Sequence, residues 1–430
     1  MKYALINGIL LDGTETMQPR PGLSILVNGD RIEAIVPAGT EGSDYERIDL
    51  AGGYVMPGLI NLHVHLPASG RPTVKQKDTK KIVRLMTSNA LLRAITFRVC
   101  AGYAKTELLS GVTTLRSVGG IQAVDSCLRD KILSGKAVGP RILAGNMAVS
   151  VPGGHMAGSL AYEASSPEEA AALVRKIAED KPDLIKLMIT GGVLDARAKG
   201  VPGELKMPPE MVKAVCDRAH SLGFPVAAHV ESTEGVRVAL ENGVDSIEHG
   251  AKLDEHLIRL FRDRGACLCT TLSPALPYAL FDRSVTNATE VEQFNGNVVF
   301  EGIIACAKAA LENDIPVVLG NDVGCPWITQ YDFWRELCYF RKYVGVSNAF
   351  ALHTATGRAA EVMGLGAVTG TIEAGKCADL IVTREDPLAD LRALRNIDLV
   401  VARGRRYDAP QVRHNALVTA ELDKFLPGND

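Results

Sequence analysis

The sequence lacks the features that mark membrane and nucleic-acid-binding proteins. No apolar stretch among its 430 residues reaches the length that spans a bilayer. No run of Lys or Arg stands out, and the formal net charge is −3, so neither a membrane nor a nucleic acid is expected as a partner. The apolar run after Met1 is too short for a signal peptide, and no small-residue cleavage site follows it. We therefore expect a cytoplasmic protein.

The nine cysteines form neither a disulfide framework nor a zinc finger. Their number is odd and their positions are scattered, which is typical of reduced thiols in a cytosolic protein. Cys267 and Cys269 stand two apart without a second pair at zinc-finger spacing, and we interpret both as packed strand residues. The chain also has no internal repeat and no low-complexity segment.

The composition is that of a globular protein with ample core material. Apolar residues make up 47% and charged residues 23% of the chain. A length of 430 residues exceeds one average domain. It suits one large α/β barrel together with a smaller module.

The two ends of the chain both have the pattern of short strands joined by tight turns. Residues 1–55 contain Asn7-Gly8 and Asn28-Gly29-Asp30 between apolar runs, which indicates antiparallel hairpins. The same pattern returns over residues 366–430, with a turn at Thr371–Gly375. We predict that these two segments pair into one small β-sandwich domain.

Residues 56–365 alternate short apolar strands with amphipathic helices, the pattern of parallel βαβ units. Eight such units in about 300 residues predict a (β/α)₈ (TIM) barrel. Helices are expected at Pro167–Asp180, Pro209–Leu222 and Glu234–Asn242. The eight predicted strands are Gly58–His65, Val112–Ser117, Arg141–Gly145, Leu184–Ile189, Pro225–His229, Ser246–His249, Cys267–Leu272 and Pro316–Gly320.

Two histidines stand two residues apart at the end of the first predicted barrel strand. On a strand, His63 and His65 point to the same side. Neutral imidazoles on one face suit Zn²⁺ and related metals. In isolation the pair has another interpretation, in which one histidine lies at the surface and the other in the core. The choice depends on ligands from elsewhere in the chain.

Four further polar residues stand at the carboxyl ends of later predicted strands, where barrel active sites lie. They are Lys186, His229, His249 and Asp322, on the fourth, fifth, sixth and eighth strands. Each alone is compatible with a packed histidine, a turn aspartate or a lysine reaching solvent. Their shared position, together with the first two histidines, indicates a common site.

This pattern resembles the metal-dependent amidohydrolase superfamily, especially its imidazolonepropionase-like and prolidase-like branch. The resemblance covers nearly the whole chain, and its last motif is similar to the strand that returns to the small β domain. The matching motifs are Gly58–His65, Gly111–Thr114, Ile185–Lys186, Ser246–Gly250, Asn321–Asp322 and Gly370–Leu380.

The resemblance implies a centre of two metal ions, with Zn²⁺ expected and Mn, Fe or Co as alternatives. One ion would be held by His63, His65 and Asp322, and the other by His229 and His249. A protonated lysine has no lone pair for a cation. The resemblance therefore implies that Lys186 reacts with CO₂ and that its N6-carboxylate bridges the two ions.

The resemblance also implies a mechanism. The two ions would generate a bridging hydroxide near neutral pH, and one ion would polarise the substrate carbonyl. Asp322 would take the proton on attack and pass it to the leaving amine. His155 matches a loop histidine used in substrate binding, so we expect it to bind substrate and stabilise the oxyanion. A purely structural role in its Gly-rich loop is the alternative.

Three positions depart from the family pattern. Asn61 and Ser117 stand where aspartates are usual, so carboxylates are missing near the site. Glu231 replaces a Tyr or His that contacts substrate in prolidase-like relatives. A carboxylate there would repel a dipeptide carboxylate and favour a neutral or cationic substrate, unless Glu231 pairs with an Arg.

Aromatic residues after the eighth strand are candidates for the wall of a substrate pocket. We predict that Trp327 and Tyr331 contact substrate. Trp334 is a third candidate for the pocket wall, and ordinary packing of its helix is the alternative interpretation.

The leading functional hypothesis is hydrolysis of a C–N bond in a small amide, urea or carbamate by the bridging hydroxide. A dipeptide or an N-acyl amino acid is also compatible with the site. A mononuclear cyclic-amide hydrolase or deaminase, in which Lys186 stays unmodified, is the second hypothesis. A non-catalytic scaffold is disfavoured because all six ligand positions are filled. The partner is then a small molecule, and the resemblance further implies a homo-oligomer.

Overall fold

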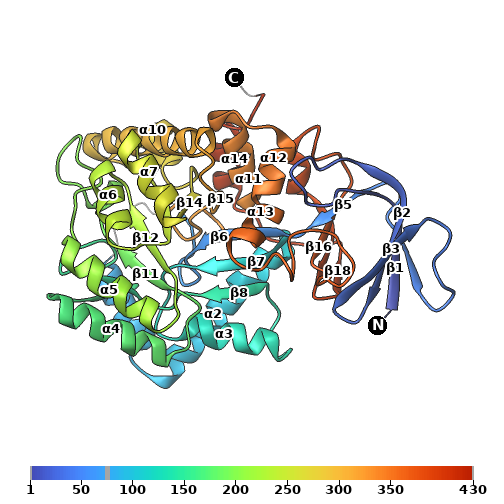
Figure 1. Ribbon diagram of the computed structural model, residues 1–430, viewed down its shortest axis with the longest axis horizontal. Helices are drawn as coiled ribbons and strands as arrows, with labels where there is room; N and C mark the ends of the chain where they lie inside the picture. The colour runs from blue at the N-terminus through green and yellow to red at the C-terminus, as the bar shows by residue number, and fades with distance from the viewer. Residues whose placement is uncertain (1, 73–77, 429–430) are drawn as a thin grey trace.

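The computed structural model describes residues 2–72 and 78–428 (Figure 1). Both ends of the chain contribute to one eight-stranded sheet, at the right of Figure 1. Its hydrogen-bonded order is β18-β17-β16-β5-β1-β2-β3, and β4 pairs with β1. The strands are β1 (Lys2–Leu10), β2 (Arg20–Asn28), β3 (Arg31–Pro37), β4 (Glu46–Asp49), β5 (Tyr54–Pro57), β16 (Leu380–Thr383), β17 (Ile397–Ala402) and β18 (Arg405–Asp408).

The two turns expected near the N-terminus have different outcomes. The turn at Asn28-Gly29-Asp30 joins the antiparallel strands β2 and β3, as predicted. The turn predicted at Asn7-Gly8 is wrong, because β1 continues through these residues with irregular pairing to β2. Asn7 adopts a φ of 56° within the strand. Asn7 therefore forms a β-bulge within β1, and the chain does not turn back at this point.

The middle of the chain forms two parallel sheets. Each of the eight strands predicted there is present. The three-stranded sheet has β6 (Leu59–Val64), β7 (Val112–Ser117) and β8 (Arg141–Ala144) in that order. The seven-stranded sheet has the order β10-β9-β11-β12-β13-β14-β15. Its strands are β9 (Ala148–Ser150), β10 (Ala161–Glu163), β11 (Ile185–Met188), β12 (Val226–Val230), β13 (Ser246–His249), β14 (Cys267–Thr270) and β15 (Val317–Leu319).

Backbone hydrogen bonds connect both edges of the three-stranded sheet to the seven-stranded sheet. The backbone N–H of His65, after β6, donates to the carbonyl of Val323, after β15, at 2.9 Å. The N–H of Asp183, before β11, donates to the carbonyl of Ala144 in β8 at 2.7 Å. The two parallel sheets are therefore joined along β6 and β8.

Helices follow the strands and surround the sheets (Figure 1). The three predicted helices correspond to α4, α5 and α6, and the side chains of Ser166 and Ser232 cap α4 and α6 by accepting backbone N–H groups. No helix of the described residues is both long and apolar enough to cross a membrane. The main helices are α1 (Thr79–Thr87), α2 (Ala90–Leu109), α3 (Val124–Leu133), α4 (Pro167–Glu179), α5 (Pro209–Ser221), α6 (Thr233–Glu241), α7 (Glu255–Arg264), α10 (Glu290–Glu312), α11 (Phe333–Tyr339), α12 (Asn348–Thr354), α13 (Gly357–Val362) and α14 (Ala416–Asp423).

The C-terminal helix α14 follows β18 in the sequence. It lies outside the eight-stranded sheet and packs against α11. The hydroxyl of Tyr339 in α11 donates to the carbonyl of Leu422 at 3.3 Å. Arg335, also in α11, forms an ion pair with Asp423. The end of the chain thus contributes to both the small sheet and the surroundings of the parallel sheets.

Candidate metal centre

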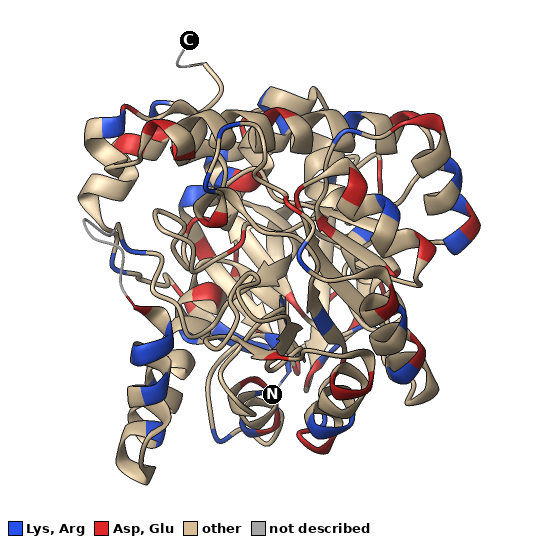
Figure 2. Ribbon diagram, turned by 90° about the vertical axis from the view of Figure 1, so that its left-hand side faces the viewer, with Lys and Arg blue, Asp and Glu red and all other residues tan. Residues whose placement is uncertain are grey.

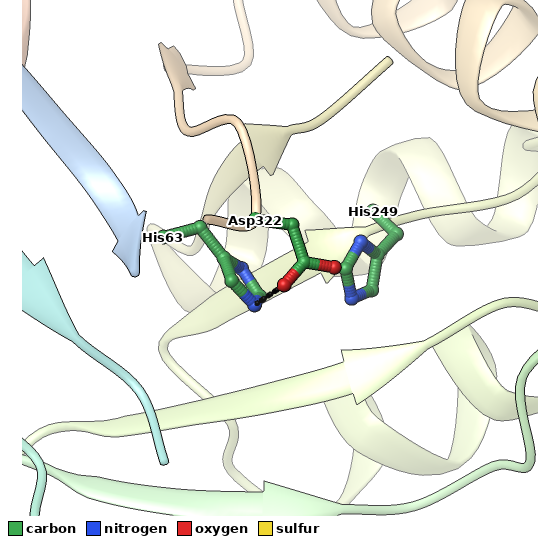
Figure 3. Close-up of side chains that lie close together, drawn as sticks. All are labelled: His63, His249 and Asp322. Atoms are coloured by element: carbon green, nitrogen blue, oxygen red, sulfur yellow. Dashed lines mark ion pairs between the residues drawn. The ribbon is translucent and has the colours of Figure 1, made fainter. Parts of the chain in front are cut away.

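The residues at the carboxyl ends of β6 and β15 meet at one point. The Nε2 atoms of His63 and His65 lie 3.5 Å and 3.2 Å from Oδ1 of Asp322. Asp322 follows β15 and adopts a φ of 56°, which turns its side chain toward the two imidazoles. Figure 3 shows His63 and Asp322 pointing toward each other, with His249 beside the carboxylate.

Two further histidines extend this cluster across the parallel strands. The ring of His249 lies 4.8 Å from that of His63 and 4.7 Å from that of His229, measured between centroids. His229 belongs to β12 and His249 ends β13. The four histidines and Asp322 are each at most 6% exposed. The structure thus brings together the predicted ligands from four strands.

The protonation states of this cluster suit a cation. Burial lowers the pKa of His63 well below its usual value and that of His249 to about 4. Burial raises the pKa of Asp322, but the neighbouring imidazoles of His63 and His65 outweigh it and hold this pKa well below its usual value. At neutral pH His63 and His249 are therefore neutral imidazoles, and Asp322 is an ionised carboxylate. These are the forms that coordinate divalent metals.

Lys186 is the most unusual member of the cluster. It lies in β11 with its side chain fully buried, and its Nζ has no hydrogen-bond partner among the described residues. Burial lowers the pKa of this amine to about 8. A buried ammonium without a partner is costly, so Lys186 loses its proton more easily than a lysine at the surface. The neutral amine is the form that can react with CO₂. The unpartnered Nζ lies near His63, His229 and His249, with which it interacts electrostatically.

Each histidine of the first pair is oriented by a hydrogen bond from its other ring nitrogen. Nδ1 of His63 donates to Oε2 of Glu248 at 2.7 Å, and Nδ1 of His65 donates to the carbonyl of Gly119 at 2.9 Å. Oε1 of Glu248 accepts from Nη2 of Arg116 at 2.7 Å. In the same way, Nδ1 of His249 lies 2.6 Å from the hydroxyl of Thr271. The Nε2 atoms are thereby left for a metal.

Sequence reasoning missed Glu248 and Thr271. Glu248 precedes His249, and neighbours on a strand point to opposite faces. His249 has a φ of 68°, which reverses the direction of its side chain at the strand end. The alternation of side chains along a strand therefore does not predict that Glu248 lies beside His63, which stands 185 residues earlier in the sequence.

Glu248→Gln is expected to weaken binding of divalent metal by about 10- to 100-fold. The neutral amide orients His63 less firmly and leaves the buried guanidinium of Arg116 without its anion. Competition with a chromogenic chelator measures the affinity, and unfolding of metal-free protein separates a folding defect. Glu241→Gln, at the surface of α6, is the matched control. An unchanged affinity in Glu248→Gln would contradict the orienting role.

The positions that depart from the family pattern have distinct local partners. The amide of Asn61 donates to Oδ1 of Asn321 at 2.8 Å, which connects the β6 strand to the residue before Asp322. The hydroxyl of Ser117 donates to Oδ2 of Asp125 at 2.5 Å. Asp125 is fully buried, and burial raises its pKa to about 6. A carboxyl group thus lies next to position 117 even though the residue there is a serine.

Asp125→Asn is expected to make stability less dependent on pH between about pH 4 and pH 6. In this window the folded carboxyl holds a proton that the unfolded chain releases, so the native state loses stability as pH rises. A shift from 3.8 to about 6 corresponds to a loss of up to about 3 kcal/mol. Denaturant unfolding at several pH values compares the two proteins. If the free energy of unfolding depended on pH equally in wild type and in Asp125→Asn, Asp125 would not titrate in this way.

His155 and Glu231 lie at the edge of the cluster. The ring of His155 stacks on that of His229, with centroids 4.1 Å apart and planes 7° apart. Its Nδ1 lies 2.5 Å from Oδ2 of Asp195, a partner that the sequence did not indicate. One ligand oxygen of Glu231 lies within 4.8 Å of ligand nitrogens of His229 and His249. Both residues therefore lie beside His229, one of the two histidines predicted to hold the second metal.

The aromatic residues after β15 have structural partners instead. The ring of Trp327 lies 5.2 Å from that of Phe281, and Trp327 is 2% exposed. The hydroxyl of Tyr331 accepts the backbone N–H of Asn415 at 2.7 Å. Trp334 stacks under the guanidinium of Arg335. The predicted role of Trp327 and Tyr331 in substrate binding stays a prediction.

Comparisons with known proteins agree with this geometry. A model of the amidohydrolase family matches residues 54–407. The structure of a proposed prolidase from Bifidobacterium longum has a TM-score of 0.87 at 35% identity and covers 98% of each chain. A Xaa-Pro dipeptidase with bound methionine has a TM-score of 0.82 at 29% identity, over 95% of this chain and 100% of that one. Imidazolonepropionase from Pseudomonas fluorescens is 26% identical over 84% of this chain and 86% of its own.

Proposed function

The chain belongs to the amidohydrolase family, and from this premise we propose that it is a metal-dependent hydrolase of a small amide, urea or carbamate. The observation that carries the proposal is the convergence of four buried histidines, Asp322 and an unpartnered Lys186 at the ends of parallel strands. These residue types match the ligands of a divalent metal centre.

The same premise supports an architecture. We assign residues 56–365, with both parallel sheets, to one closed (β/α)₈ barrel, and residues 1–55 and 366–430 to the small β domain. The contact between His65 and Val323, beside the first and last strands, supports the closure. In such a barrel the carboxyl ends of the strands hold the active site.

In this proposal two divalent ions, with zinc as the expected metal, occupy the cluster. His63, His65 and Asp322 would hold one ion, and His229 and His249 the other. A carboxylated Lys186 would contribute to both. When bound, the ions supply Lewis acidity and lower the pKa of a water molecule.

The chain's own residues handle the protons and the substrate. The carboxylate of Asp322 is placed to take a proton from the attacking water and to deliver it to the leaving nitrogen as the C–N bond breaks. Asp195 lies 2.5 Å from Nδ1 of His155 and orients the ring, and a hydrogen bond from His155 to the substrate carbonyl oxygen would stabilise the negative charge that develops there.

Glu231 narrows the class of substrate. Its Oε2 is buried and has no hydrogen-bond partner within the described part of the chain. Burial, together with the carboxylates of Asp322 and Asp195, raises its pKa well above the usual range. A substrate carboxylate at this place would add a third negative charge nearby. We therefore propose a leaving group that is neutral or cationic near Glu231.

A matched set of N-acyl amides, ureas and carbamates tests this function. The compounds differ only in whether the leaving amine carries a cationic, a neutral or a carboxylate substituent. We expect metal-loaded protein to prefer the first two. Glu231→Gln should reduce the preference by roughly tenfold, or 1.4 kcal/mol, at alkaline pH, where Glu231 has lost its proton. Metal content is measured alongside, because Glu231 also lies near two proposed ligands. Absence of turnover for every compound, with two metals bound, would overturn the proposed function.

A further inference from the structure

Glu336 is a charged residue that the fold places inside the molecule. The helices around the outside carry many of the charged residues, drawn blue and red in Figure 2. Glu336 lies on α11 and is 0% exposed. Burial raises the pKa of its carboxyl to about 7, and the carboxylate of Asp322 adds to this shift. A carboxylate is costly to bury unless its oxygens accept hydrogen bonds, so the donors that face Glu336 show what it does.

These donors all come from the segment after β14, residues 271–275, which we call the β14 loop. The strand itself ends at Thr270. The N–H of Leu272 donates to Oε1 of Glu336 at 2.6 Å, and the N–H of Ser273 donates to Oε2 at 2.8 Å. The hydroxyl of Ser273 donates to the same Oε2. Leu272 and Ser273 are both buried, so their N–H groups need such an acceptor. One side chain of α11 therefore holds two consecutive residues of the β14 loop.

The residue before this pair contacts a proposed metal ligand. The hydroxyl of Thr271 lies 2.6 Å from Nδ1 of His249, and both side chains are buried. A neutral imidazole has one N–H, and an acceptor beside Nδ1 keeps the proton on that nitrogen. Nε2 then keeps its lone pair for a metal. The place of the hydroxyl depends on the loop backbone, which Glu336 holds at the next two residues.

We propose that Glu336 is a positioning residue of the metal centre. It fixes the β14 loop, so the hydroxyl of Thr271 stays at Nδ1 of His249 and the ring presents Nε2 to the second ion. This role rests on the proposed function, in which His249 holds that ion. It differs from a purely structural role, in which Glu336 only satisfies two buried N–H groups.

A double-mutant cycle on metal affinity separates the two roles. Thr271→Val is expected to weaken binding of the second Zn²⁺ by roughly 10- to 100-fold, and Glu336→Gln by about tenfold. The amide of Gln would direct its own N–H toward the N–H groups of the loop. If Glu336 acts through Thr271, adding Glu336→Gln to Thr271→Val should change the affinity by less than about twofold. An equal loss in both backgrounds would show a purely structural role and overturn the proposal.

Two further variants complete the titration with Zn²⁺ against a chromogenic chelator. Thr271→Ser keeps the hydroxyl and should keep the wild-type affinity. Glu312→Gln, at the exposed end of α10, is the matched control for Glu336→Gln. A loss of affinity in Thr271→Ser as large as that in Thr271→Val would overturn the proposal, because the hydroxyl would then not be the group that acts.

The ring of His249 gives a second readout that needs no metal. In metal-free protein labelled with ¹⁵N-histidine, we expect the proton on Nδ1 in wild type and a shift toward the Nε2–H form in Glu336→Gln. The spectrum of His249→Gln assigns the signal. A wild-type ring protonated on Nε2, or an unchanged ring in Glu336→Gln, would overturn the proposal. The expected ring in a wild type that binds no second ion would overturn the proposed function, and with it the role of Glu336 in metal binding.

Ser273→Ala provides the same test if Glu336→Gln does not fold. It removes one of the three hydrogen bonds to Glu336 and leaves both backbone N–H groups paired. We expect the affinity for the second Zn²⁺ to fall by about threefold, and the loss to vanish in the Thr271→Val background. A wild-type affinity together with a wild-type ring of His249 would overturn the proposal.

Discussion

Asp322→Asn is expected to lower kcat by roughly 10²- to 10⁴-fold, the usual contribution of a positioned acid–base group. The amide keeps the size of the side chain and an oxygen for a metal, but it cannot take a proton from water. In the structure this carboxylate is buried and lies within 3.5 Å of two imidazole nitrogens. Steady-state kinetics with a cleaved substrate, together with metal analysis of the same sample, gives the result.

The control for this variant is available at the other end of the same strand. Asp314 precedes β15, is exposed and has the same φ of 56° as Asp322. Asp314→Asn repeats the chemical change and the backbone conformation away from the histidines, so its kcat should stay at the wild-type value. If Asp322→Asn retained full kcat with normal metal content, Asp322 would not be the proton carrier.

The sequence predicted the parallel strands and the proposed ligands because both depend on local patterns. A buried strand corresponds to a short apolar run in the sequence. A ligand at the end of the strand stands directly after this run. His229 and His249 illustrate this, since each terminates its own predicted strand. The arrangement of parallel strands then brings these ends together without further information from the side chains.

The parts that could not be predicted depend on contacts between distant segments. Next to the bulge at Asn7, Gly8 packs against Leu50, where a Cβ would come within 2.6 Å of the leucine side chain. Tyr331 was expected at the substrate, but its hydroxyl is used by the backbone of Asn415, 84 residues later. No local pattern in the sequence records either contact.

Lys186→Met is expected to lower affinity for the second metal by at least about 100-fold, and turnover with it. Methionine fills a similar volume but cannot form a carbamate, so the proposed bridge is lost. Metal analysis after gel filtration should give one ion per chain instead of two. Full activity with a single ion in the variant would favour the mononuclear alternative for this site.

In the metal-free protein, Lys186→Met should increase the free energy of unfolding at neutral pH. Burial lowers the pKa of Lys186 from 10.5 to about 8, so the wild-type fold excludes a proton that the unfolded chain still binds. Unfolding then takes up a proton between pH 8 and pH 10.5, and wild-type stability rises with pH across that window. Below pH 8 the buried amine costs about 3 kcal/mol, which Lys186→Met removes. Denaturant unfolding in the presence of a chelator should therefore show that Lys186→Met is more stable than wild type at pH 7. The free energies of unfolding of the two proteins should converge near pH 10. A variant less stable than wild type at pH 7 would show that the amine has a partner in solution.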